Sequence, residues 1–161
     1  MGRPKQLLPW KNTSLLNHSI QLAHDLNQGA TYVVLGAHRD VITPHIRYQN
    51  INLICNDNWS FGIGASISAG IKVILNSKSS YDGALIMLAD QPLLHTNYLT
   101  SLIKFFNTES EQIIASSYGD KSVGVPAIFH RSFFKELSQL TKNFGAKKVI
   151  KRHMNRVKIL E

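Results

Sequence analysis

Short apolar runs and amphipathic segments take turns along this chain, and that alternation limits its fold more than any other feature. Apolar runs bounded by turn residues predict buried strands, whereas apolar residues spaced three and four apart predict helices. Strands are expected over residues 32–35, 51–55, 84–89, 112–117, 125–129 and 157–160. Helices are expected over residues 14–26, 40–49, 65–77, 96–106, 133–141 and 146–153. This order predicts an α/β fold of three layers, with helices covering both faces of a mostly parallel sheet.

The chain is expected to form one domain. Its 161 residues are close to the roughly 150 that are typical of a domain. No internal repeat, low-complexity tract or Pro/Gly-rich linker divides it, so we assign residues 1–161 to a single domain. No apolar run approaches the length of about 18 residues that a membrane span needs. Cys55 is the single cysteine, which excludes an internal disulfide, favours a reducing, cytoplasmic compartment and predicts a small buried side chain.

The charge balance is strongly basic, with 18 Lys and Arg against 10 Asp and Glu. The cations gather at the two ends of the chain: Arg3, Lys5, Lys11, Lys142, Lys147, Lys148, Lys151, Arg152, Arg156 and Lys158. Such a surface attracts nucleic acid, an acidic lipid surface or a phosphorylated small molecule, although solvated lysines that serve solubility are an equal alternative. The basic segments lack a recognition motif with interleaved aromatic residues, so nucleic acid is not expected as a partner.

Ligands of parallel α/β sheets bind beyond the carboxyl ends of the strands, which here lie at Gly36, Asn56, Asp90 and Gly119. Asp90 follows the run 84–89, which is apolar throughout and therefore predicts a central strand covered on both faces. A carboxylate at such a strand end suits Mg²⁺, which takes one or two protein carboxylates together with phosphate oxygens and water. The alternative is an aspartate that caps the following turn.

Two other segments suit an anionic ligand. The run Gly62-Ile63-Gly64-Ala65-Ser66 lies where a loop leads into a helix, and free N–H groups at a helix start favour anions. A helix start that needs a flexible entry explains the same glycines. Arg3 and Lys5 combine a forked guanidinium with a mobile ammonium, a pair suited to a polyphosphate. A disordered basic N-terminus is the alternative for that pair.

Together, these segments resemble the molybdenum-cofactor cytidylyltransferases, a branch of the MobA-like NTP transferase family. The resemblance covers essentially the whole chain, and the motifs occur in family order. Gln91 looks like the cytidylyl branch, whereas the guanylyl branch usually has methionine there. The motifs are Met1-Gly2-x-Pro4-Lys5-x-Leu7-Leu8-Pro9, Val33-Val34-Leu35-Gly36-Ala37, Asn56-Asp57-x-Trp59-x-x-Gly62-x-Gly64-x-Ser66-Ile67-x-x-Gly70, Leu88-Ala89-Asp90-Gln91-Pro92, Gly124-x-Pro126-x-x-Phe129 and Gly145-Ala146-Lys147.

The resemblance implies a Rossmann-like nucleotidyltransferase fold and a Mg²⁺-dependent enzyme that transfers CMP from CTP to the terminal phosphate of molybdopterin and releases pyrophosphate. A molybdoenzyme or its chaperone is a further implied partner. Alternatives are a guanylyl- or sugar-phosphate nucleotidyltransferase, and a degenerate module that binds nucleotide or cofactor without catalysis. The implied site residues are Arg3 and Lys5 as catalytic, triphosphate-binding cations, Asp90 as a catalytic residue and metal ligand, and Gly36, Gly64 and Ser66 near the nucleotide base and ribose.

The chain departs from the family pattern in two places. Family members begin with an apolar strand and a Leu-Ala-Ala-Gly-x-Ser-x-Arg loop just before Met-Gly, whereas the numbering here begins at Met1. We therefore expect the family's first strand and Gly-rich loop, roughly 15–20 residues, upstream of Met1. The family's Gly-Asp-x-Gly-Ala becomes Lys142-Asn143-Phe144-Gly145-Ala146, so an uncharged amide stands at Asn143 in place of a carboxylate.

Overall fold

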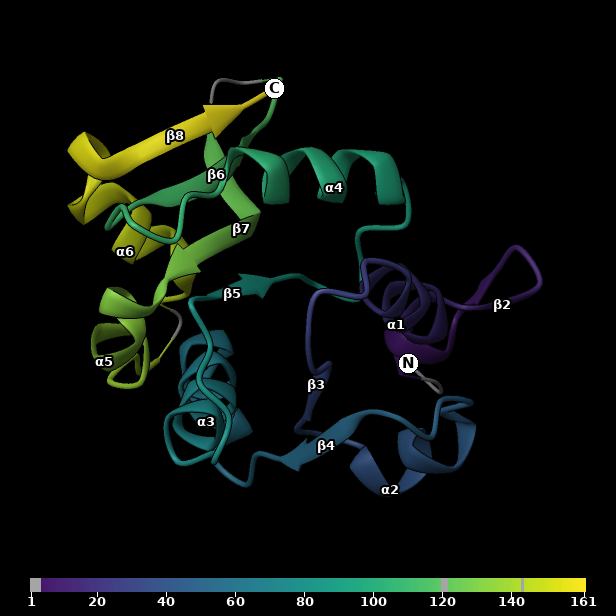
Figure 1. Cartoon of the computed structure of the whole chain (residues 1–161). Coiled ribbons are helices and arrows are strands. Elements are labelled where there is room, and N and C mark those ends of the chain that lie inside the picture. The colour runs from purple at the N-terminus through teal and green to yellow at the C-terminus, as the bar shows by residue number, and fades with distance from the viewer. Residues whose placement is uncertain (1–3, 120–121, 143) are drawn as a thin grey trace.

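The fold is known from a computed structural model, which describes residues 4–119, 122–142 and 144–161 (Figure 1). Its largest sheet has the order β5-β7-β6-β8. Strand β7 runs antiparallel to both β5 and β6, whereas β6 and β8 are parallel. The bounds are β5 (Gly83–Ile86), β6 (Ile113–Ser117), β7 (Val123–His130) and β8 (Val157–Leu160). The α/β class is confirmed, and the pairing is mixed rather than mostly parallel.

Two smaller sheets precede it along the chain. Strands β3 (Tyr32–Leu35) and β4 (Asn52–Cys55) form a parallel pair. Strands β1 (Pro9–Trp10) and β2 (Thr13–Ser14) form an antiparallel hairpin, which the sequence analysis did not predict. Strand β4 is largely exposed, and Cys55 at its end is exposed as well, so the prediction of a buried thiol was wrong.

Helices cover both faces of the largest sheet, which gives the expected three layers. Side chains alternate between the two faces of a strand. Accordingly, Ile113 and Ala115 of β6 pack in a core cluster with residues of α3, α5 and α6, while Ile114 packs with residues of α1 and α4. The helices are α1 (Leu15–Asp25), α2 (Arg39–Ile42), α3 (Ile63–Leu75), α4 (Thr96–Phe105), α5 (Phe134–Leu137) and α6 (Ala146–Arg152).

All six predicted helices are present, and two are much shorter than expected. Ser14 caps α1, because its hydroxyl accepts a hydrogen bond from the Asn17 amide at 3.3 Å. Helix α2 ends at Ile42 and continues as the 3₁₀ turn Thr43–His45, since Pro44 has no N–H to extend an α-helix. Helix α5 is also shorter than expected and ends at Leu137 rather than at residue 141. His95, not Thr96, occupies the N-cap position of α4.

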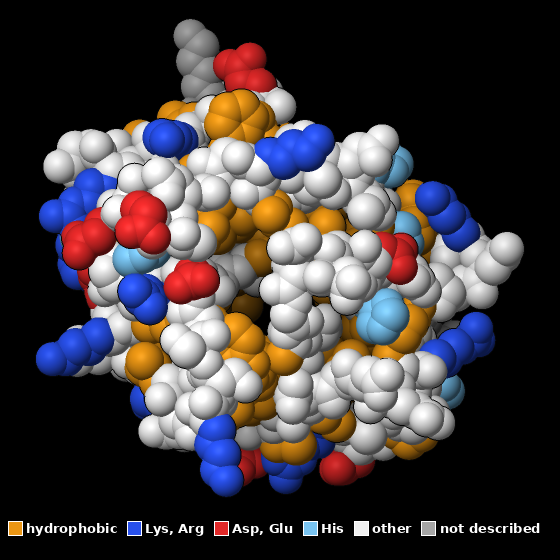
Figure 2. Space-filling model, viewed as in Figure 1, with side chains coloured by type: hydrophobic (Ala, Val, Ile, Leu, Met, Phe, Trp, Pro, Cys, Tyr) orange, Lys and Arg blue, Asp and Glu red, His pale blue; other side chains and the backbone are white. Residues whose placement is uncertain are grey.

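Strands β3 and β5 each leave one edge without a backbone partner among the described residues. Helix α3 packs against both: Gly70 lies against Val34 of β3, and Ile71 belongs to the core cluster that Ala84 and Ile86 of β5 contact. Figure 2 shows this face of the molecule hollowed near its centre, with hydrophobic side chains lining the hollow. Strand β5 is therefore half-buried and at a sheet edge, where the sequence predicted a central strand.

Within the described ranges, no helix has the length and apolar character that a membrane crossing requires.

Candidate functional site

The carboxyl ends of β3 and β4 meet at Gly36 and Asn56. The Asn56 amide donates to the Leu35 carbonyl at 2.7 Å, which continues the parallel pairing beyond β4. Trp59 covers Gly36 so closely that a Cβ atom on Gly36 would lie 2.3 Å from the Trp59 Cβ. Real Cβ contacts of this kind do not occur, so the site requires glycine at residue 36 for the indole to take this position.

The Asn56 side chain connects these strand ends to α3. It is 4% exposed. Its Nδ2 donates to the Ser66 hydroxyl at 3.1 Å, and its Oδ1 accepts from the Asn58 amide at 3.0 Å. Asn56 belongs to one of the sequence motifs but had no expected role, because nothing in the neighbouring sequence indicates that its partner lies on the next helix.

The first turn of α3 contacts the loop that leads into α6. The Gly64 amide donates to the Lys142 carbonyl at 3.1 Å. A Cβ atom on Gly64 would lie 2.5 Å from the Phe144 carbonyl oxygen, so glycine allows the two backbones to approach this closely. Gly36, Gly64 and Ser66 therefore lie in one region, which Asn56 and Trp59 link together.

Asp90 lies in the exposed turn that follows β5, and the described ion pairs do not involve it. Lys5 is exposed in the 3₁₀ turn Lys5–Leu7. No contact between Lys5 and Asp90 is present in the described part of the chain, and Arg3 lies outside it, as does Asn143.

The single carboxylate of Asp90 fits a hard divalent cation that takes most of its ligands from water and substrate rather than from the protein. The described residues contain no group of three or more His, Cys, Asp or Glu side chains placed to hold a metal ion. An ion at Asp90 would therefore complete its shell with phosphate oxygens and water, which is the coordination that Mg²⁺ accepts. A metal bound to the protein alone, such as structural zinc, does not fit these donors.

The side chain of Gln91 ties the Asp90 turn to β7. Its Nε2 donates to the Val125 carbonyl at 2.9 Å, and its Oε1 accepts from the Leu88 amide at 3.4 Å. The two motifs that contain Gln91 and Val125 are far apart in sequence, and this contact brings them together at the carboxyl end of β5.

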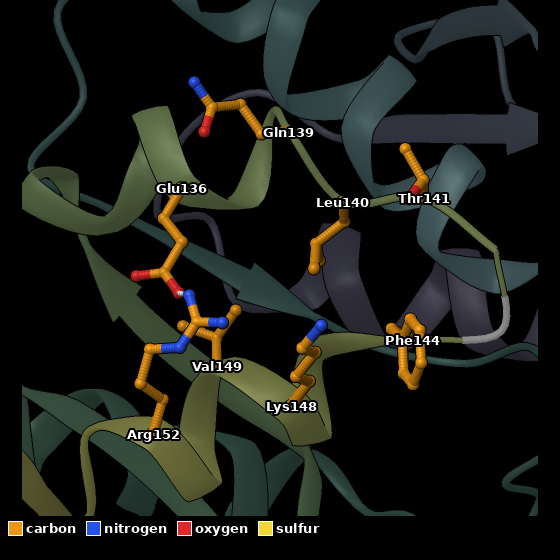
Figure 3. Close-up of a pocket in the computed structure, with 8 residues that line it drawn as sticks. All are labelled: Glu136, Gln139, Leu140, Thr141, Phe144, Lys148, Val149 and Arg152. Atoms are coloured by element: carbon orange, nitrogen blue, oxygen red, sulfur yellow. Dashed lines mark hydrogen bonds and ion pairs between the residues drawn. The ribbon is translucent and has the colours of Figure 1, made fainter.

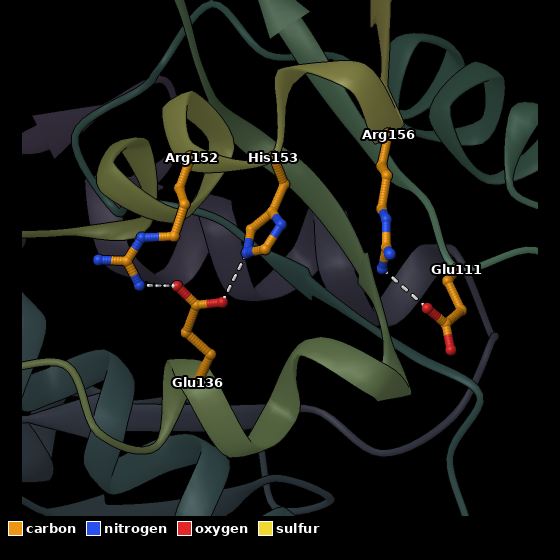
Figure 4. A network of polar contacts seen from close by, with 5 residues as sticks. All are labelled: Glu111, Glu136, Arg152, His153 and Arg156. Atoms are coloured by element: carbon orange, nitrogen blue, oxygen red, sulfur yellow. Dashed lines mark hydrogen bonds and ion pairs between the residues drawn. The ribbon is translucent and has the colours of Figure 1, made fainter.

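The basic C-terminal segment is partly neutralised by carboxylates (Figure 4). Glu136 accepts from Arg152 at 2.5 Å and contacts His153 Nε2 at 2.7 Å. Arg156 pairs with Glu111 at 2.8 Å. These contacts hold α6 and the following turn against neighbouring elements, so part of the expected cationic surface serves the fold.

A small cavity lies beside this network, between α5 and α6 (Figure 3). Its volume is about 150 Å³. The ammonium of Lys148 lies 4.1 Å from the centre of the Phe144 ring at its rim, a cation–π contact. The cavity is lined by Glu136, Gln139, Leu140, Thr141, Phe144, Lys148, Val149 and Arg152. None of the predicted site residues lines it.

Similar proteins of known sequence are bifunctional GlmU proteins of Pseudomonas. The chain is 25% identical over 117 residues to GlmU of Pseudomonas savastanoi pv. phaseolicola, which is 73% of this chain and 24% of that protein. It is 29% identical over 101 residues to GlmU of Pseudomonas fluorescens, which is 63% of this chain and 21% of that protein. The chain thus spans less than a quarter of the length of these curated relatives.

Solved structures match nearly the whole chain. The manganese complex of Rv0371c from Mycobacterium tuberculosis superposes with a TM-score of 0.82 at 26% identity, covering 99% of this chain and 82% of that chain. The nucleotidyl transferase Mth528 from Methanothermobacter gives a TM-score of 0.79 at 15% identity, covering 95% and 72%, and so shows the fold alone.

The family assignment rests on the sequence as well as on the fold. Residues 1–157 match the family described as the MobA-like NTP transferase domain. The match includes the strand ends at Gly36 and Asn56, the first turn of α3 and the Asp90 turn, which are the elements that form the candidate site. The chain therefore belongs to the MobA-like NTP transferase domain family of nucleotidyltransferases.

Proposed function

We propose that this chain transfers CMP from CTP to the terminal phosphate of molybdopterin and releases pyrophosphate, with Mg²⁺ as its metal. The observation that carries the proposal is the placement of Gly36, Ser66 and Asp90 after strand ends or at the start of α3 in a nucleotidyltransferase fold. Residue 91 is glutamine, as in the cytidylyl branch, and this resemblance favours CTP among the nucleotides. The same site would serve a guanylyl- or sugar-phosphate transferase, and a panel of nucleotides separates these possibilities.

The nucleotide would lie across the ends of β3, β4 and β5. The region linked by Asn56 and Trp59 would face the base and ribose, because it brings Gly36, Gly64 and Ser66 together beside the carboxyl ends of β3 and β4. Arg3 and Lys5 would bind the triphosphate, and Lys5 would stabilise the departing pyrophosphate through its mobile positive charge. Asp90 would hold the metal ion, which supplies neutralisation of phosphate charge when bound.

The transfer reaction needs little general acid–base catalysis by the protein. An oxygen of the acceptor's terminal phosphate attacks the α-phosphorus of CTP, and the bond from that phosphorus to the bridging oxygen of the β-phosphate breaks. The attacking phosphate is already an anion, so no general base is required. Positioning of the two phosphates and neutralisation of their repulsion therefore account for most of the rate.

A module that binds nucleotide without catalysis is the second candidate function. It is favoured by the uncharged amide at Asn143, where the resembling family has a carboxylate. In either case, the phosphorylated acceptor and a receiving molybdoenzyme or chaperone are the proposed partners. We place the activity in the cytoplasm, where the exposed Cys55 would remain a thiol.

The deciding experiment is pyrophosphate release by the purified chain with molybdopterin and each of CTP, GTP and UTP, in Mg²⁺ and in Mn²⁺. We expect release that requires both CTP and molybdopterin. Calorimetric binding of CTP without any release would favour the binding module. Preference for another nucleotide, or for a sugar phosphate as acceptor, would overturn the cytidylyl assignment while retaining nucleotidyl transfer.

A further inference from the structure

A shift of register in the β6–β7 pairing leaves one backbone carbonyl next to the Asp90 turn without a partner on β6. Ala115 pairs with Ala127, but the next residue, Ser116, pairs with Gly124, so Val125 and Pro126 have no pairing partner on β6. The Pro126 carbonyl accepts from the Ser116 hydroxyl at 2.6 Å. Val125 has no partner in the β6 ladder, so its carbonyl needs other donors.

Two side chains satisfy the Val125 carbonyl, and they also bond to each other. Gln91 Nε2 donates to the Val125 carbonyl and to the Tyr118 hydroxyl, both at 2.9 Å. The Tyr118 hydroxyl in turn donates to the Val125 carbonyl. Both amide hydrogens of Gln91 are therefore engaged within the protein, so this side chain has no donor left for a nucleotide base.

The position of Tyr118 is itself fixed by its surroundings. Tyr118 directly follows β6, and its amide donates to the Ser122 carbonyl at 2.9 Å. A Cβ atom on Gly124 would lie 3.3 Å from the Tyr118 ring, so glycine gives the ring its room. Burial raises the pKa of the Tyr118 phenol above its ordinary value.

We propose that Tyr118 is a positioning residue for the metal-binding turn: through Gln91, it holds the turn that carries Asp90 against β7. The inference rests on the proposed function, since it matters for catalysis only if Asp90 binds the metal ion. In the sequence, Asp90 and Tyr118 are separated by an entire helix and strand, and Tyr118 belongs to none of the family motifs. The contacts through Gln91 are what assign it this role.

The test removes the hydroxyl alone. Tyr118→Phe keeps the ring and deletes both hydroxyl contacts, and Gln91→Met deletes the amide while keeping the length of the side chain. Tyr98→Phe is a matched control, because the Tyr98 hydroxyl also donates to a backbone carbonyl, that of Leu160, at 3.2 Å. We measure Mn²⁺ affinity by electron paramagnetic resonance with CTP present, CTP affinity without metal, and amide exchange over residues 88–92.

Tyr118→Phe should weaken Mn²⁺ binding about tenfold, the scale expected for the loss of two weak hydrogen bonds, and should speed amide exchange over residues 88–92. CTP affinity without metal should not change, and Tyr98→Phe should resemble the wild type. The double variant Tyr118→Phe/Gln91→Met should lose no more Mn²⁺ affinity than the more impaired of the two single variants, because both side chains act through one network.

Unchanged Mn²⁺ affinity and unchanged exchange in Tyr118→Phe would overturn the proposal. Equal weakening in Tyr118→Phe and Tyr98→Phe would also overturn it, since that result indicates a general loss of stability. Mn²⁺ binding that Asp90→Asn leaves intact contradicts the proposed function instead. In that case, faster exchange over residues 88–92 in Tyr118→Phe still supports the hold of Tyr118 on the turn.

Discussion

The Tyr32 hydroxyl lies 3.1 Å from the Tyr81 hydroxyl, and the two rings meet edge to face with 6.3 Å between their centroids. Tyr32 begins β3, and Tyr81 lies two residues before β5. In the described part of the chain these two strands belong to different sheets and share no backbone pairing. The tyrosine pair therefore joins the two blocks of strands through side chains.

The tyrosine contact should make stability fall at high pH. Hydrogen bonding with Tyr81, followed by burial, raises the pKa of Tyr32 to about 12, against an ordinary value of about 10. As the pH rises, Tyr32 therefore loses its proton in the unfolded chain before it does so in the folded chain. The contribution of the tyrosine contact to the free energy of unfolding is complete below pH 10 and is lost as pH rises to about 12. In urea unfolding between pH 9 and 12, the free energy of unfolding should fall more steeply with pH in the wild type than in Tyr32→Phe. Identical pH profiles would contradict the assignment.

The unpaired edges of β3 and β5 should accept one more strand. We propose that an apolar strand and a Gly/Ser-containing loop, attached upstream of Met1, fill the hydrophobic hollow between them, as the family resemblance implies. Adding such a segment should raise the melting temperature and slow amide exchange in both β3 and β5, because their free backbone groups gain partners.

The control for this extension is a segment of equal length in which prolines interrupt the strand. It should leave melting and exchange as they are in the chain of residues 1–161, since proline cannot donate to a sheet. Intact mass measurement of the natural protein tests the same proposal directly. An apolar extension that changes neither melting nor exchange would count against a strand in this hollow.

The sequence predicted the elements whose signals are local. Apolar spacing placed α1 and α3 to within a few residues, and apolar runs placed β3, β6 and β8. The direction of β7 was not predictable, because an apolar run indicates a strand without indicating its partners. The hairpin β1–β2 was missed because strands of two residues carry no periodicity. Cys55 was predicted as buried because it ends an expected strand, whereas β4 lies at an edge and is open to solvent.

The candidate site was predictable as a set of strand ends and not as a set of contacts. Gly36, Ser66 and Asp90 were found because they follow apolar runs or begin a helix. Their supporting partners come from elsewhere: Asn56 reaches Ser66 on α3, and Tyr118 reaches Gln91 across a helix and a strand. Side chains that act across such separations leave no pattern in a single sequence.

Gly36→Ala should disturb the nucleotide region while leaving the rest of the fold intact. The added methyl group would overlap Trp59, so the indole and the loop around Asn58 must shift. We expect weaker CTP binding by calorimetry and a changed tryptophan emission spectrum. Gly119→Ala is the matched control, because a Cβ atom there meets nothing within 4 Å in the described structure. Equal CTP affinity in both variants would contradict the assignment of Gly36 to the nucleotide-binding region.

Lys5→Ala should weaken binding of the triphosphate more than binding of the monophosphate, because the proposed partner of Lys5 is the β/γ end of CTP. Lys5 is exposed, so its removal should not alter the melting temperature. Calorimetry with CTP, CDP and CMP measures the difference. Lys11→Ala is a suitable control, since Lys11 is another exposed cation near the N-terminus. Equal losses of affinity for CTP and CMP would contradict the proposed contact between Lys5 and the β- and γ-phosphates.

Asp90→Asn tests the centre of the proposed chemistry. The carboxylate is exposed and makes no ion pair with the described residues, so the amide should leave the melting temperature unchanged. Transfer should fall at least ~100-fold, the scale expected for the loss of an electrostatic catalytic group. Asp57→Asn serves as a control, because that exposed aspartate follows β4 and pairs with Arg39 instead. Turnover of CTP by Asp90→Asn at the wild-type rate under limiting Mg²⁺ would show that the metal binds elsewhere.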